Sequence, residues 1–177
     1  MYLKTQTLGR LPTPTTAQLS NLPEGKAGTV ATLRIMRDLA RAAIRDPQQK
    51  IRLAALNIIG QLPARQWSSE VAALHRFVRD DIRYVRDPVG VESVATPDKT
   101  LEIGQGDCDD KSVLLAALLE SVGHPARFRA IGLNGGPFSH VLVQTKIGPQ
   151  WVNAETIIPV ELGWTPKGVT SNYILGV

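Results

Sequence analysis

Apolar residues recur at a helical spacing through the first half of the chain. Three such segments follow one another, at about residues 29–45, 47–62 and 68–85. Apolar positions three and four residues apart form one stripe on a helix, so each segment predicts an amphipathic helix with one buried face. Asp46-Pro47 and Leu62-Pro63 separate the segments, because a proline disfavours helix at the residue before it.

A fourth helix is predicted at residues 108–122, and it has no polar stripe. Residues 113–119 are all apolar, which is typical of a helix that is buried on every side. Gly123 and Pro125 end this helix. The preceding residues, 87–106, show no clear period, and a loop of this length inside a compact domain often has a function.

After residue 125 the pattern changes to that of β-strands. Strands are predicted at about residues 126–131, 138–145 and 151–158, with turn clusters rich in glycine and proline between them. Helices followed by antiparallel strands indicate an α+β fold with a helical N-terminal half. We expect the helix that begins at Cys108 to lie at its centre and to pack on the antiparallel sheet.

The same patterns divide the chain into three parts. Residues 1–28 contain closely spaced prolines and are predicted to be an extended arm. Residues 29–160 are predicted to be one globular domain, whose N-terminal part is helical. Residues 161–177 have no strong pattern and are predicted to be an irregular tail.

Composition narrows the classes of function. The chain has 177 residues, a net charge of +4 and a single cysteine, which excludes a disulfide framework and a cysteine-rich zinc site. No apolar run approaches the roughly 18 residues of a membrane span, and the first residues lack the pattern of a signal peptide. We therefore expect no membrane span and a cytoplasmic location. Aromatic residues make up only 5% and no nucleic-acid-binding motif is present, so nucleic acid is not an expected partner.

The candidate chemistry starts at Cys108, the first residue of the predicted fourth helix. A helix N-terminus lowers the pKa of a thiol, and the thiolate is the nucleophile. Acyl transfer by a thiol also needs a base and a group that orients the base. His140 is the candidate base, and Glu155 is the candidate orienting group. A glycine-proline turn lies between them, so neighbouring antiparallel strands can place both side chains on one face.

Three further residues are candidates for supporting roles. Asn153 is a rival to Glu155, because both lie on the same strand face and papain-type enzymes orient their histidine with an asparagine. A developing oxyanion needs hydrogen-bond donors. The backbone N–H of Cys108 is one candidate donor, and Gln105 and Tyr84 are side-chain candidates.

Three aspartates flank the thiol, at positions 107, 109 and 110. Carboxylates at a helix start are favoured by the helix dipole. Nearby anions also raise the pKa of a thiol, and they therefore oppose the effect of the helix end. An oxygen-rich metal site needs more ligands in a defined loop, so we predict neither a metal nor another cofactor.

Several short segments resemble the transglutaminase-like superfamily, and some of them resemble its bacterial and bacteriophage members in particular. The resemblance covers about residues 70–160 and includes the cysteine motif Gly-Asp-Cys-Asp-Asp-Lys, the histidine motif and the acidic motif. The segments are residues 82–84, 96–97, 106–111, 123–128, 139–141 and 151–156.

The resemblance implies a papain-like fold with a Cys-His-Asp triad. It assigns the nucleophile to Cys108, the base to His140 and the third member to Glu155, where the family usually has aspartate. It further implies a cysteine-dependent amide-bond hydrolase or acyltransferase that acts through a thioester. The substrate would be a peptide or protein amide, with cell-wall peptides among the candidates.

The alternative hypothesis is a non-catalytic structural or interaction module on the same fold. The arm at residues 1–28 and the tail at residues 161–177 are suited to contacts with neighbouring subunits. This hypothesis makes phage structural proteins the candidate partners and a phage virion the candidate location.

Overall fold

The computed structural model describes residues 16–18, 22–63, 65–87 and 93–177. A short strand and the helices come first: β1 (Thr16–Gln18), α1 (Gly25–Ile44), α2 (Lys50–Ile59), α3 (Trp67–Arg76) and the π-helix η1 (Phe77–Asp81). The middle of the chain contains β2 (Arg83–Tyr84), β3 (Ser93–Ala95), α4 (Pro97–Ile103) and β4 (Gln105–Gly106). The last part contains α5 (Cys108–Ser121), β5 (Ala126–Leu133), β6 (Phe138–Ile147), β7 (Gln150–Ala154) and β8 (Val169–Gly176).

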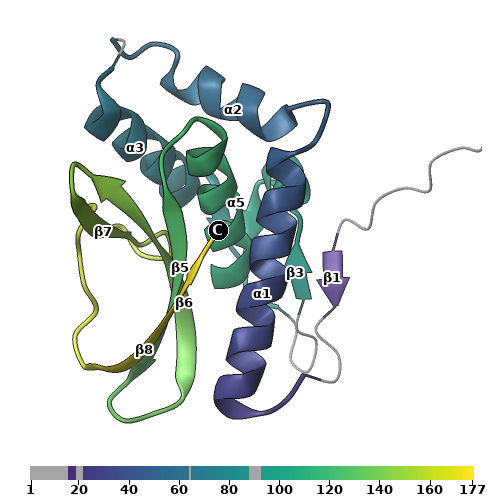
Figure 1. Cartoon of the computed structure of the whole chain (residues 1–177), viewed down its shortest axis with the longest axis vertical. Coiled ribbons are helices and arrows are strands. Elements are labelled where there is room, and N and C mark those ends of the chain that lie inside the picture. Colours follow the sequence, from purple (N-terminus) through teal and green to yellow (C-terminus); the bar gives the residue numbers. More distant parts are fainter. Residues whose placement is uncertain (1–15, 19–21, 64, 88–92) are drawn as a thin grey trace, which may run out of the picture.

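The main sheet has four antiparallel strands in the order β7-β6-β5-β8. The helices lie against one face and one end of this sheet, with α1 and α5 beside it and α2 and α3 above (Figure 1). Two small sheets join β1 with β3 and β2 with β4. The predicted α+β class and the antiparallel sheet are therefore confirmed.

Helix α5 is the centre of the core. Its residues from Asp110 to Leu119 are all buried. Helices α1, α2, α3 and α4 and strands β5 and β6 all contact it, which explains why its sequence has no polar face. The prediction of a central buried helix that begins at Cys108 and packs on the sheet is confirmed.

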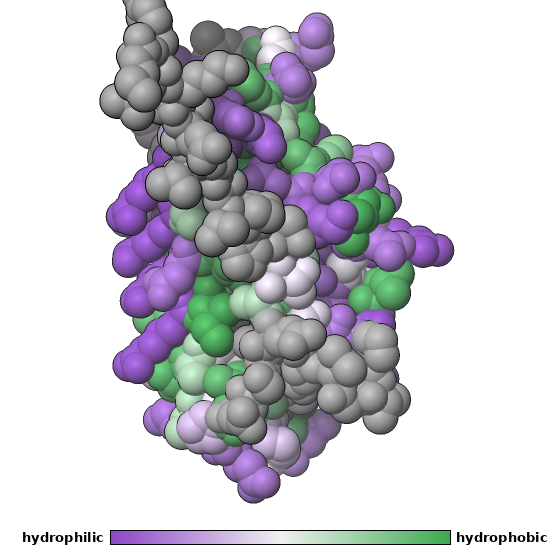
Figure 2. All heavy atoms as spheres, turned by 90° about the vertical axis from the view of Figure 1, so that its right-hand side faces the viewer, coloured by the Kyte–Doolittle hydropathy of each residue, from purple (hydrophilic) through white to green (hydrophobic). Residues whose placement is uncertain are grey.

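Helix α1 has the expected division into two faces. Its buried residues include Leu33, Met36 and Ala40, whereas Arg34 and Arg45 are exposed. Figure 2 shows the side of the molecule on which α1 lies, and hydrophilic side chains project along one edge of it. Among the described residues, none of the helices has the length and apolar content needed to cross a membrane.

The region between α3 and α5 differs from the sequence prediction. The third helix was expected to reach residue 85, but it widens into η1 and ends at Asp81. Strand β2 follows, because Arg83 and Val85 donate their N–H groups to Gly104 and Gly106. These partners lie about twenty residues away in the sequence, so the local apolar period gave no sign of the strand. Part of the expected loop also forms α4, which Thr96 caps.

The two ends of the chain also differ from the prediction. The prediction of an irregular tail is wrong for Val169–Gly176, which forms β8 and pairs with β5 along its length. The stability of β8 comes from its pairing with β5, and the sequence of residues 161–177 as a whole shows no strong period that announces it. At the other end, α1 begins at Gly25 inside the expected arm, and Thr16–Gln18 pairs with β3. The rest of the expected arm, residues 1–15 and 19–21, lies outside the described residues.

Candidate active site

The start of α5 is fixed by a reciprocal cap. Oδ1 of Asp107 accepts the N–H groups of Asp109 at 2.9 Å and of Asp110 at 3.1 Å. Oδ2 of Asp110 in turn accepts the N–H of Asp107 at 3.2 Å, which completes a capping box. A Cβ atom on Gly106 would lie 2.5 Å from the Cβ of Asp110, so this close approach requires glycine. These contacts hold Cys108 at the first helical position.

Strand β6 contacts α5 through the peptide groups of Val141. The backbone N–H of Val141 faces the thiol of Cys108 and acts to lower its pKa. The hydroxyl of Ser112, one helical turn later, donates to the carbonyl oxygen of Val141 at 3.4 Å. This edge of β6 is open to α5 because β7 pairs with β6 only from Val143 onward. The thiol therefore lies beside the residue that follows His140.

His140 and Glu155 form a short hydrogen bond. Nε2 of His140 lies 2.6 Å from Oε2 of Glu155. A carboxylate only accepts, so this bond assigns the proton of the neutral imidazole to Nε2 and leaves Nδ1 as an acceptor. Oε1 of Glu155 accepts the N–H of Ile157 at 2.7 Å. Burial alone would raise the pKa of Glu155, but the bonds from His140 and from the backbone outweigh burial and hold this pKa below its usual value.

The thiol of Cys108 is held in its neutral form. Burial is the main cause that raises its pKa, and the carboxylates of Asp109 and Asp107 raise it further. The sulfur lies 3.5 Å from Oδ1 of Asp109, to which it donates. The N–H of Val141 acts in the opposite direction but is the smaller influence. Burial and the flanking carboxylates, which the sequence indicated as opposing the helix start, therefore set the direction of this pKa.

The rival orienting residue, Asn153, is engaged elsewhere. Its Oδ1 accepts from Arg129 at 3.0 Å and from Gln144 at 2.8 Å. Its Nδ2 donates to the carbonyl of Trp164 and the hydroxyl of Thr165, both at 3.0 Å. Every polar atom of the amide thus has a partner on the sheet or in the following segment, so the geometry favours Glu155 as the partner of His140.

The two oxyanion candidates lie on the short parallel pair β2–β4. Oε1 of Gln105 accepts from Nη2 of Arg83 at 2.6 Å, which leaves the amide nitrogen of Gln105 as a donor. Gln105 lies two residues before the cap residue Asp107. Tyr84 is 40% exposed on the neighbouring strand. The structure thus brings both residues near the start of α5 without a described hydrogen bond to Cys108 or His140.

Sequence reasoning missed Lys111. This residue is 1% exposed, although it follows Cys108 by only one helical turn. Its Nζ donates to the carbonyl oxygens of Ile82 at 2.6 Å and Arg79 at 3.3 Å, at the C-terminal end of η1. Burial lowers the pKa of Lys111 to about 8. The only signal in the sequence is a lysine within a segment that is otherwise predicted to be buried.

Asp107, Cys108 and Asp109 form a cluster of ligand-type atoms in the described part of the chain. One ligand atom from each lies within 4.8 Å of the others. However, one oxygen of Asp107 already accepts two N–H groups, and Ca²⁺ takes six to eight oxygen ligands. Burial also raises the pKa of Asp107 to about 6, which weakens it as a ligand. We assign no metal to this cluster.

Comparison with protein families gives a match to the transglutaminase-like superfamily over residues 55–156. Comparison with the curated proteins gives no significant match.

The fold is shared with solved structures of other proteins. LapG from Legionella pneumophila in its calcium-bound form is 17% identical, with a TM-score of 0.55 over 78% of this chain and 80% of LapG. A "putative protease" from Parabacteroides distasonis is 11% identical, with a TM-score of 0.58 over 77% of this chain. A "putative cysteine protease" from Cytophaga hutchinsonii is 16% identical, with a TM-score of 0.50 over 81% of this chain. The chain spans only 30% and 52% of the last two proteins, respectively.

Proposed function

This chain belongs to the transglutaminase-like superfamily, and from this premise we propose that it is a cysteine-dependent amide-bond hydrolase or acyltransferase. The observation that carries the proposal is the 2.6 Å bond from His140 to Glu155, which leaves Nδ1 of His140 free to accept a proton. The sulfur of Cys108 lies against the next residue of β6, Val141. Nucleophile, base and orienting group thus follow in the order that thiol acyl transfer needs.

The reaction begins with a neutral thiol. Sγ of Cys108 attacks the carbonyl carbon of the amide while its proton passes to Nδ1 of His140, and Glu155 stabilises the imidazolium that forms. The C–N bond then breaks, the nitrogen takes the proton from Nδ1, and the amine leaves a thioester behind. Water or a second amine attacks this thioester with His140 as base. The C–S bond breaks, and the sulfur recovers its proton.

The backbone N–H of Cys108 is the donor best suited to the oxyanion. Asp107 caps the N–H groups of Asp109 and Asp110 and not that of Cys108. A first-turn N–H also lies at the positive end of the helix dipole. Gln105 is the proposed side-chain donor, because the bond from Arg83 to its Oε1 fixes the amide and leaves the nitrogen as the donor. Together they would stabilise the charge that develops on the carbonyl oxygen.

We propose a peptide or protein amide as the substrate, with cell-wall peptides included. The protease names of two of the similar structures support this class. Hydrolysis and transfer share the same thioester, and they differ only in whether water or an amine attacks it.

The proposal is tested by labelling the thiol with iodoacetamide and quantifying the adduct by mass spectrometry. If His140 and Cys108 act together, labelling will depend on pH near neutrality, and His140→Ala will abolish that dependence. Cys108→Ala is the blank. His124→Ala is the matched control, because His124 pairs with Glu70 at 2.9 Å and is a histidine outside the site. Equal rates in wild type and His140→Ala would refute the coupling.

The competing proposal is a non-catalytic module, for example in a phage particle. The raised pKa of Cys108 favours it, because a neutral thiol is a poor nucleophile. This proposal predicts slow labelling that is indifferent to His140. It also predicts no turnover of peptide libraries by the wild-type protein, whereas the enzyme proposal predicts turnover that Cys108→Ala removes.

A further inference from the structure

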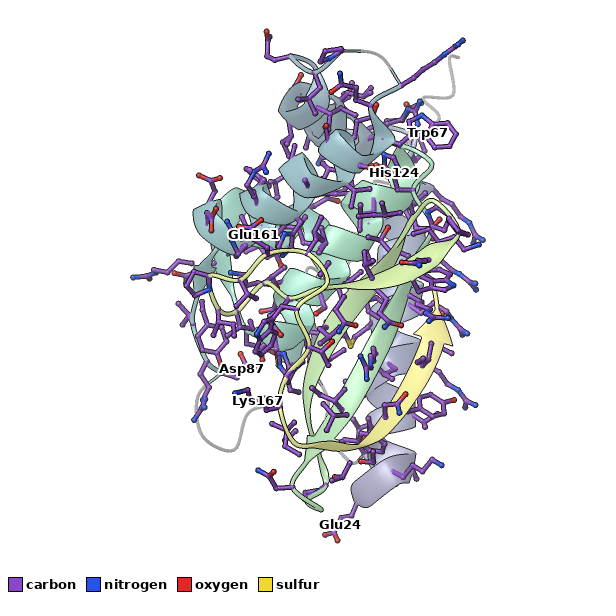
Figure 3. The ribbon with its side chains drawn as sticks, turned by 90° about the vertical axis from the view of Figure 1, so that its left-hand side faces the viewer. Glu24, Trp67, Asp87, His124, Glu161 and Lys167 are labelled. Carbon is purple, nitrogen blue, oxygen red and sulfur yellow. The ribbon has the colours of Figure 1, made fainter. Side chains whose placement is uncertain are left out.

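Helix α3 and its continuation η1 contact the segment that follows β7 at two points. Nε2 of His75 lies 2.6 Å from the main-chain oxygen of Glu155. Nη1 of Arg79 lies 2.6 Å from the carbonyl oxygen of Val160 and 3.2 Å from Oε1 of Glu161. His75 and Arg79 are four residues apart and therefore share a helix face. Figure 3 shows the loop with Glu161 running beside these helices.

The bond from His75 fixes the tautomer of its ring. A carbonyl oxygen only accepts, so Nε2 of His75 must carry the proton that is shared with Glu155. Nδ1 is buried and has no hydrogen-bond partner among the described residues. This environment favours an unprotonated Nδ1 over an N–H donor. The side chain is 1% exposed, and burial lowers the pKa of His75. His75 is therefore a neutral donor directed at the backbone of Glu155.

Glu155 needs such a support because the sheet does not hold it. It is the first residue after the end of β7 at Ala154, so no strand ladder fixes its main chain. A glutamate side chain also has one more rotatable bond than an aspartate, and each free bond costs conformational entropy when the side chain is ordered. The carboxylate can hold a 2.6 Å bond to His140 only if its backbone stays in place.

We propose that His75 is a positioning residue that fixes the main chain of Glu155 and thereby orients His140. Its effect on turnover rests on the proposed function, whereas its effect on the bond between His140 and Glu155 does not. The role differs from general core packing, because it predicts that the N–H donor of His75 matters more than the volume of the ring.

The first test uses the wild-type protein and ¹⁵N-imidazole NMR. The chain has only three histidines, so three pairs of ring signals are expected, and His124→Gln assigns one pair. The proposal requires His75 with a protonated Nε2 and an unprotonated Nδ1, and a slowly exchanging Nε2–H on His140. A protonated Nδ1 on neutral His75 would overturn the proposal, because the bond to Glu155 could then not exist.

The second test separates the donor from the ring. His75→Phe keeps a flat ring without the donor, whereas the amide nitrogen of His75→Gln can replace Nε2. We expect His75→Phe to accelerate exchange of the His140 Nε2–H, to raise the pKa of Glu155 towards its usual value and to lower kcat about tenfold to a hundredfold with KM little changed. His75→Gln should retain most of each property, and His124→Gln should change none.

Failure of the proposal for His75 and failure of the proposed function give different results. If His75→Phe lowers only the melting temperature and leaves exchange, the pKa of Glu155 and kcat as in the wild type, then His75 is a packing residue and the proposal is wrong. If neither the wild-type protein nor any variant turns over an amide, the proposed function fails. The NMR signals still decide whether His75 positions Glu155. Should His75→Phe not fold, the tautomer and the His75→Gln variant still provide the test.

Discussion

Nε2 of His140 lies 2.6 Å from Oε2 of Glu155, although fifteen residues separate them in the chain. The register of β6 and β7 pairs Val143 with Ala154, so its continuation would place Glu155 opposite Leu142, two residues from His140. The carboxylate of Glu155 must therefore reach along β6, from the position opposite Leu142 towards His140. A glutamate has the extra methylene that this reach requires, which gives a physical reason for a residue other than the family's usual aspartate.

Substitution of Glu155 tests this relationship directly. Glu155→Gln should lower kcat/KM by about 10³–10⁴-fold, because an amide favours the wrong imidazole tautomer. Glu155→Asp should also lose activity, because the shorter side chain cannot span the same distance from the same backbone. Steady-state kinetics measure both effects, with circular dichroism to check folding. Wild-type activity in Glu155→Asp would contradict the argument from reach.

The lowered pKa of Glu155 predicts a dependence of stability on pH. A carboxyl whose pKa is lowered by folding stabilises the protein above its unfolded value of 4.5, and this contribution is lost as the pH falls through the folded value. The free energy of unfolding of the wild type should therefore fall more steeply below pH 4.5 than that of Glu155→Gln. Urea unfolding at a series of pH values measures both slopes. Parallel slopes would show that the bond to His140 does not stabilise the carboxylate.

Asn153→Ala should lower the stability of the protein and leave its activity unchanged. The variant leaves Gln144 and Arg129 without a buried acceptor, which costs about 2–3 kcal/mol of stability. Because Asn153 does not contact His140, kcat of the folded protein should stay close to that of the wild type. Thermal unfolding and kinetics at a temperature below the transition separate the two quantities. A large fall in kcat without a loss of stability would restore Asn153 as the orienting residue.

The carboxylate of Asp109 should restrain the thiol. Asp109→Asn removes a negative charge 3.5 Å from the sulfur, so the pKa of Cys108 should fall. One unit of pKa means about tenfold more thiolate, and alkylation at constant pH should accelerate by about that factor. Asp38→Asn is a matched control on α1, where the carboxylate pairs with Arg37 at 3.3 Å. Equal alkylation rates in both variants would rule out this electrostatic effect.

The buried ammonium of Lys111 predicts a second dependence of stability on pH, in the same direction as that of Glu155 but at higher pH. Folding lowers its pKa from 10.5 to about 8, so its charged form destabilises the protein at neutral pH. At about 1.36 kcal/mol per unit, the wild type should lose about 3 kcal/mol relative to Lys111→Met as the pH falls from 10.5 to about 7. Chemical unfolding of both proteins across this range measures the difference. A constant difference would mean that Lys111 keeps its usual pKa in the fold.

The sequence by itself determined much of the scaffold. The apolar period identified α1 and α2, the buried character of α5 and the strands β5 and β6, because each pattern reflects which side of a local element avoids water. The order Cys108, His140, Glu155 and its motifs also indicated the family and the candidate chemistry. Such features are visible locally because residue type and spacing alone define them.

Only the tertiary structure decided which residues contact one another and which protonation state their side chains have. Strands β2 and β8 exist because of hydrogen-bond partners far away in the chain, so no local period announced them. The raised pKa of Cys108 follows from burial, which depends on everything that packs around α5. The bond of His75 to the backbone of Glu155 joins residues eighty positions apart. Distance, burial and hydrogen bonding are properties of the packed molecule, and they decide how the residues that the sequence singles out can act.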